Sequence, residues 1–441
     1  MELAISKIAT KGKYNDYHFM SLFLSVALIC LAPFTTQYLF FVALAIQIIR
    51  LVSCKAEVFF VDIVCLLPFS NLFREPGGKS LYVILIIAAC VFFAFTKNFK
   101  INFIWIICVC LVCYFLARST NDFVTALPVL SGALLICIAT VFINRENAII
   151  ISKAYILSLF ASSIFGYIFK ESNALIHYTR NPTLAHHGSD AVRFKGLFTD
   201  PNYYSSCVII AIALMVVLYL CKEVNTTLFV TAFSGLTVFG FITYSKMFLI
   251  VYVFVCLFYL ATSVKRKRFT ILFIIGFLVL FILFNFMSDK LEFFAIMRDR
   301  FTEADDLNSF TTGRSDAWID YLDYIFANTK TLFLGETLNA PLLNKIGTHN
   351  LALELLYYSG VVGLTLFVVF LCAAVKNSMI NNFSEISAHK DIMKYGLIIA
   401  FVIVYMSLQA VFSSAMYVQW ILVCVGIIIG NNTPKKEKEI E

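Results

Sequence analysis

Charged residues are scarce in this 441-residue sequence: Lys, Arg, Asp and Glu together make up only 14% of it. Hydrophobic residues make up 61%, against about 45–50% in a soluble globular domain. One soluble core cannot bury that much apolar surface. The composition therefore excludes soluble enzymes, nucleic-acid-binding proteins, disordered chains and secreted disulfide scaffolds. A membrane-spanning helix needs about 20 mainly apolar residues, so the chain is predicted to be an all-α, polytopic integral membrane protein.

The sequence also has little material for disulfide frameworks or metal sites. Its thirteen cysteines lie within apolar runs or at their ends, which predicts no disulfide framework outside the cytoplasm. The three cysteines at 108–113 have no His or carboxylate near them and are interpreted as packing residues. The adjacent histidines at 186–187 have only Asp190 and Asp200 nearby, which favours a solvated loop over a metal site. We predict no metal and no other cofactor.

Fourteen apolar runs are candidate membrane spans, and their even number places both termini on one side. Two of the runs depart from the usual pattern, because one contains Asp62 and Pro68 and another is rich in Thr, Gly and Ser. The fourteen runs lie at residues 18–34, 36–53, 57–72, 80–96, 101–117, 123–143, 148–169, 203–221, 227–243, 245–263, 269–287, 350–375, 395–412 and 414–430.

The distribution of Lys and Arg predicts which side holds the termini. With cytoplasmic termini, the cytoplasmic segments contain 20 of the 34 basic residues and the short external turns contain only four. The remaining ten lie in two long loops, to which the positive-inside rule does not apply. Both termini are therefore predicted to be cytoplasmic, and both long loops external.

These predictions divide the chain into three groups of spans and two external loops. Within the larger loop, apolar residues recur every three or four positions at 290–301 and at 317–328, which predicts two amphipathic helices. Nearly all of the irregular polar sequence thus lies on one face. The predicted parts are N-terminal spans (1–169), an external loop (170–202), central spans (203–287), a large external loop (288–349), C-terminal spans (350–430) and a cytoplasmic tail (431–441).

The end of the first external loop contains a possible anion site. Asp200, Pro201 and Asn202 form a helix-start pattern, in which a capping residue is followed by proline. Arg193 and Lys195 lie just before this helix start. The positive end of a helix dipole also attracts anions, so two cations there favour a bound anion. Contact with lipid headgroups explains the two cations equally well.

Further polar residues follow on the same predicted face. Lys246 lies in a short external turn, where it either reaches lipid phosphates or donates to a bound anion. Arg314 lies at the start of a predicted helix. His349 and Asn350 lie at the external mouth of the span at 350–375, and Glu354 is one turn beyond Asn350. A histidine that a carboxylate orients suits a general base, although a structural role is the alternative. Cations gathered around this histidine suggest a bound pyrophosphate and a proton acceptor.

Five sequence motifs follow one another over about residues 190–370: RFKGLFTDPN, a short SK turn, GRSDAW, LGE and THNLALELLYYSGVVGL. In their order, spacing and common side, they resemble those of the O-antigen ligase/polymerase superfamily. The DPNYYS and YSKMF segments look more like Wzy-type polysaccharide polymerases than like lipid A-core ligases.

The resemblance implies a metal-independent, inverting glycosyl transfer from an undecaprenyl-pyrophosphate-linked donor, at the periplasmic face of the bacterial inner membrane. The superfamily's essential arginines correspond to Arg193 and Arg314, and its essential histidine to His349, as catalytic residues. Lys246 stands where relatives often have arginine, which keeps the charge but loses bidentate phosphate binding. The other residues predicted to contact the pyrophosphate or the glycan are Lys195, Asp200, Asn202, Asn350 and Glu354.

Three functions are compatible with these residues. The first is a polymerase of lipid-linked repeat units, and the second is a ligase that transfers finished glycan to lipid A-core or another acceptor. The third is a flippase for lipid-linked oligosaccharides, which is expected to carry cations inside its membrane helices; the predicted spans contain few charges. The expected partners are undecaprenyl-pyrophosphate-linked glycans, membrane lipids and, for a polymerase, a chain-length regulator, but no nucleic acid.

Overall fold

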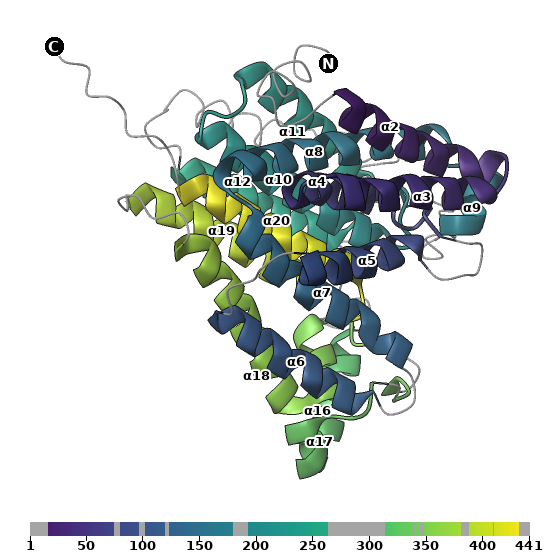
Figure 1. The fold of residues 1–441 in the computed structure, drawn as a ribbon. Helices are drawn as coiled ribbons and strands as arrows, with labels where there is room; N and C mark the ends of the chain where they lie inside the picture. Colours follow the sequence, from purple (N-terminus) through teal and green to yellow (C-terminus); the bar gives the residue numbers. More distant parts are fainter. Residues whose placement is uncertain are drawn as a thin grey trace.

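The computed structural model describes residues 16–74, 80–96, 102–119, 123–179, 193–262, 314–338, 340–343, 347–380, 388–408 and 410–431. Within these residues the fold is all-helical, with sixteen α-helices and two short 3-10 helices (Figure 1). The span predicted at 269–287, the amphipathic helix predicted at 290–301 and the histidines at 186–187 lie outside the described residues.

Thirteen of the fourteen predicted spans coincide with an α-helix, and the three remaining described α-helices lie in the two loops predicted to be external. The amphipathic helix predicted at 317–328 corresponds to α16. The helices are α2 (Asp16–Leu31), η1 (Ala32–Phe34), α3 (Tyr38–Ser53), α4 (Ala56–Leu66), η2 (Leu67–Phe69), α5 (Leu81–Thr96), α6 (Phe103–Arg118), α7 (Phe123–Phe142), α8 (Arg145–Ile168), α9 (Asn173–Thr179), α10 (Pro201–Leu220), α11 (Thr226–Phe241), α12 (Lys246–Thr262), α16 (Arg314–Ala327), α17 (Thr329–Leu334), α18 (Leu351–Ile380), α19 (Ala388–Tyr405) and α20 (Ser414–Asn431).

Three of these helices, α8, α10 and α18, are long and apolar enough to cross a membrane. Nine further apolar stretches of helix in the described part of the chain are shorter. Together with the overall hydrophobicity of the sequence, the three long helices indicate a membrane protein.

Helix α10 lies at the centre of the molecule and is almost entirely buried (Figure 1). It packs against α8, α11, α12, α19 and α20, as expected for a helix that is apolar on all sides. Its N-terminus has the predicted cap, because the Asp200 carboxylate accepts a hydrogen bond from the Asn202 amide at 2.6 Å. A central helix with a capped end gives the neighbouring loop a fixed attachment point.

Contacts between turns divide the turns into two groups, one at each end of the helical body. Arg118, the last residue of α6, donates a hydrogen bond to the carbonyl of Gly335 at 2.6 Å, and both residues belong to predicted external segments. Arg145 and Glu223 form an ion pair at 2.5 Å, and both belong to predicted cytoplasmic turns. The contacts thus join segments that the hydropathy pattern assigns to the same side.

Helix α18 is interrupted at Gly360, whereas the sequence predicted a continuous span over 350–375. Gly360 has a φ of +63°, which breaks the helical path. A Cβ atom on Gly360 would lie 2.4 Å from the backbone of Phe333 and 2.6 Å from that of Gly335, so α17 packs directly against the break. The Glu336 amide then donates to the Tyr357 carbonyl at 2.7 Å. The break therefore docks the external helices onto α18.

Helix α4 is shorter than the span predicted at 57–72. It has eleven residues, or about 16 Å at 1.5 Å per residue, roughly half of the ~30 Å hydrocarbon core. The chain continues past α4 as a 3-10 turn that contains Pro68. Asp62 is fully buried on α4, where its two carboxylate oxygens accept hydrogen bonds from the Arg50 guanidinium at 2.6 and 2.7 Å.

We expect Asp62→Ala to destabilise the protein by about 3–5 kcal/mol, because it leaves the buried Arg50 charge without a partner. Glu223→Ala removes a carboxylate from the more exposed pair with Arg145, whose side chains are 23% and 24% exposed, and should cost about 1 kcal/mol or less. Thermal unfolding of both variants in the same detergent measures the difference. Equal losses of stability would contradict a special role for the buried pair.

Candidate functional site

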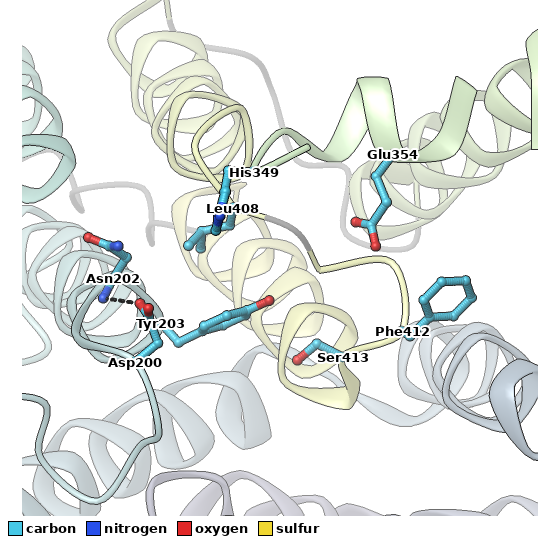
Figure 2. Close-up of a pocket in the computed structure, with 8 residues that line it drawn as sticks. All are labelled: Asp200, Asn202, Tyr203, His349, Glu354, Leu408, Phe412 and Ser413. Carbon is cyan, nitrogen blue, oxygen red and sulfur yellow. Dashed lines mark hydrogen bonds between the residues drawn. The ribbon is translucent and has the colours of Figure 1, made fainter. Parts of the chain in front are cut away.

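A cavity of about 360 Å³ lies where the start of α10, the start of α18 and the connection between α19 and α20 meet. Figure 2 shows how side chains from these three parts of the chain surround it. Four of the lining residues are predicted site residues, which the fold brings together from distant positions in the sequence. The lining consists of Asp200, Asn202, Tyr203, His349, Glu354, Leu408, Phe412 and Ser413.

His349 is held in an unusual backbone conformation just before α18. Its φ is +43°, a region that residues other than glycine enter at a cost of about 1–3 kcal/mol and that is common at functional sites. The carbonyl of Thr348 accepts a hydrogen bond from the Trp318 indole at 2.7 Å. On the other side, the Asn350 side chain caps α18 by accepting from the Leu353 amide at 3.1 Å. Both neighbours of His349 are therefore fixed.

The imidazole of His349 belongs to the lining of the cavity. It makes no hydrogen bond to any other side chain or backbone group in the described part of the chain. Burial lowers the pKa of His349, and the positive charge of Arg314 lowers it further, while the Asp200 carboxylate opposes both effects. The net direction keeps the ring neutral at neutral pH, which is the form that a general base needs.

Arg314 is the first residue of α16 and lies beside the cavity. Its guanidinium donates a hydrogen bond to the carbonyl of Ser407 at 3.3 Å. Burial lowers the pKa of Arg314, with Asp200 acting in the opposite direction, and an arginine remains charged throughout the physiological pH range. The positive charge of Arg314 therefore interacts electrostatically with both His349 and Asp200.

Arg193 reaches the cavity through Asn202. It donates to the Asn202 side-chain oxygen at 3.2 Å and to the Thr243 carbonyl at 2.9 Å. The Ser245 hydroxyl donates to the same Asn202 oxygen at 2.9 Å. Arg193 thus ties the end of the first external loop to the turn between α11 and α12, and it brings a second cation to the edge of the cavity.

Two further predicted cations do not line the cavity. Lys195 is buried, and its ammonium group donates to the Thr179 carbonyl at 2.8 Å. Burial lowers its pKa to about 8, against the opposing effect of Asp200. Lys195 thereby links the loop to the end of α9, a structural contact. Lys246 is half-buried at the start of α12, next to Ser245.

Glu354 is almost completely buried, at 1% exposure. The sequence suggested that it orients His349. The hydrogen bonds that the structure gives for its carboxylate hold another segment, because one oxygen accepts from the amides of Ala410 and Val411 at 2.7 and 3.0 Å. Glu354 therefore anchors the connection between α19 and α20, which forms one wall of the cavity.

Sequence reasoning missed four lining residues. Tyr203 directly follows the capping pattern that was noticed, and its ring crosses the cavity between His349 and Ser413 (Figure 2). Leu408, Phe412 and Ser413 lie between α19 and α20. The predicted span at 395–412 hid Leu408 and Phe412, because α19 ends at Tyr405 and the chain after it forms an irregular wall. In the sequence, only the adjacent serines at 413–414 indicated an irregular segment at this position.

No protein-family model matches the sequence, and no curated protein or solved structure is significantly similar to it. In the described part of the chain, no group of three or more His, Cys, Asp or Glu side chains is placed to hold a metal ion. The site therefore has to be interpreted from its own chemistry. It combines a neutral imidazole, two arginines, a carboxylate at a helix start and a cavity open to a ligand.

Replacing Glu354 tests its anchoring role. We expect Glu354→Ala to leave the amides of Ala410 and Val411 unpaired, at about 1–3 kcal/mol for each buried donor. Glu354→Gln keeps an acceptor oxygen and should have the smaller effect. Hydrogen exchange at 406–413 measures the result, with exchange fastest in Glu354→Ala. Unchanged exchange in both variants would show that another contact holds the connection.

Proposed function

We propose that the protein is a polysaccharide polymerase, a glycosyltransferase that joins lipid-linked oligosaccharide repeat units into O-antigen or a related surface polysaccharide. The observation that carries this proposal is the position of His349 in the cavity lining, where the charge of Arg314 acts on it, with Arg193 linked to the same cavity through Asn202. A neutral base beside two cations suits the transfer of a sugar from a pyrophosphate to a hydroxyl. The order of the sequence motifs supports the same reaction.

The proposed membrane arrangement has about fourteen spans, with both termini in the cytoplasm. The cavity then faces the periplasm, because every described segment that borders it is predicted to be external. An inner-membrane location fits a substrate carried by undecaprenyl pyrophosphate, whose polyprenyl chain stays in the bilayer. Two lipid-linked substrates in one membrane also meet more readily than two soluble substrates.

In the proposed mechanism, Arg314 and Arg193 bind the donor's pyrophosphate. Negative charge develops on the phosphate oxygen as its bond to the anomeric carbon breaks, and fixed cations stabilise that charge. His349 accepts the proton of the attacking acceptor hydroxyl. The hydroxyl oxygen attacks from the face opposite the leaving group, so a single displacement inverts the anomeric configuration. The step needs no metal.

A ligase is the closest alternative, since it uses the same donor chemistry and differs in its acceptor, such as lipid A-core. A flippase is a more distant alternative. A flippase is expected to expose charges along a path through the membrane. The buried pair of Arg50 and Asp62 neutralises itself and lies on α3 and α4, outside the cavity lining, so it does not support a flippase.

The direct test supplies purified protein with lipid-linked single repeat units and separates the products by glycan length on a gel. A polymerase yields a ladder. Label that moves only onto added lipid A-core identifies a ligase, and repeat units that cross a liposome membrane without reaction identify a flippase. Either of these two results would overturn the proposal.

The same assay tests the residues. We expect Arg314→Ala and Arg193→Ala to lower the rate by about 10²-fold, because each removes a cation that stabilises the leaving group. His349→Ala should abolish the ladder. Lys330→Ala, an exposed cation on α17, is the matched control and should leave the rate unchanged. Full activity of Arg314→Ala would contradict the assignment.

A further inference from the structure

Two carboxylates line the cavity, and the structure gives them different surroundings. Glu354 is buried and uses one oxygen to hold two backbone amides. Asp200 is only half-buried. One of its oxygens caps α10 by accepting from the Asn202 amide. Its other oxygen accepts no hydrogen bond within the described part of the chain and belongs to the cavity lining.

The proposed reaction places a second positive charge, on His349, next to that of Arg314. The acceptor oxygen forms a bond to the anomeric carbon, and the bond from that carbon to the phosphate oxygen breaks, with its electron pair remaining on the phosphate. The acceptor's proton moves to a nitrogen of His349, which becomes a cation beside Arg314. Two neighbouring cations disfavour each other, so proton transfer is impeded unless a negative charge lies near the ring.

Charged and titratable side chains from several described elements line the cavity or contact its lining. Arg314 on α16 and Arg193 in the 193–200 segment are cations. Tyr203 on α10 is a phenol in the cavity lining. Glu354, on the helix that follows His349, is held by the amides of Ala410 and Val411. Asp200 is the carboxylate whose charge acts on both His349 and Arg314.

We propose that Asp200 is the carboxylate partner of His349: one oxygen caps α10, and the charge on the other stabilises the imidazolium that forms when His349 takes the acceptor's proton. This inference rests on the proposed glycosyl transfer. Asp200 acts through His349 and is a positioning residue that also sets the charge balance. In Figure 2, the side chains of Asp200 and His349 both lie to the left of those of Glu354 and Phe412.

The cap makes Asp200 unusually easy to test. Asparagine and serine cap helices about as well as aspartate, so Asp200→Asn and Asp200→Ser remove the charge and keep the fold. We expect a fall in kcat of about 10-fold or more, with KM for the donor unchanged or lower, because a negative charge near the pyrophosphate is removed. Asp323→Asn, on the exposed side of α16, is the matched control and should change neither value.

The pH dependence separates this role from simple capping. Asp200 raises the pKa of His349, so its loss should lower that pKa and move the acid limb of kcat/KM to lower pH. A residue that only caps α10 would leave the limb in place. Asp200→Asn with wild-type kcat and an unshifted limb, or with a kcat that falls only together with the melting temperature, would overturn the proposal.

A second measurement does not depend on the enzyme activity. Diethyl pyrocarbonate reacts with neutral imidazole, and peptide mass spectrometry reports its reaction with His349 across a pH range. The midpoint of this reaction should lie at lower pH in Asp200→Asn than in wild type. If wild-type protein makes no ladder but the midpoint shifts, the proposed function fails and the coupling of the two side chains stands. An unshifted midpoint refutes the coupling itself.

Discussion

The fixed N-terminus of α10 is the constraint on which the site depends. The helix is buried among five neighbours, so its first turn cannot move without disturbing the centre of the fold. Asp200 caps that turn, Asn202 receives Arg193 and Ser245, and Tyr203 crosses the cavity. Polar groups on a rigid, packed element keep their geometry without help from a ligand, which is what electrostatic catalysis requires.

The rest of the site is assembled around that end by hydrogen bonds to backbone groups. Arg314 donates to the Ser407 carbonyl, Trp318 to the Thr348 carbonyl, and the amides of Ala410 and Val411 donate to Glu354. Each of these bonds joins two segments that are at least thirty residues apart in the sequence. The strained backbone at His349 is tolerated because both of its neighbours are held.

Hydropathy and capping patterns predicted most of the helices and several of the cavity residues, because burial in a membrane and helix capping are local properties of the sequence. The break at Gly360 was not predictable in this way, since it depends on the approach of Phe333 in α17 and of Gly335 just after that helix. The sequence also did not show that Asp200 and Glu354 have different roles. Both are carboxylates near a helix start, and only the partners that tertiary packing supplies distinguish them.

The anchoring of Glu354 has a consequence for biosynthesis. Its partners, the amides of Ala410 and Val411, are made more than fifty residues after it, and the Ser407 carbonyl that receives Arg314 also lies in this late segment. A chain still leaving the ribosome has His349 and both arginines but lacks the wall that completes the cavity. The order of synthesis thus leaves the cavity incomplete until α19 and α20 have joined the bundle.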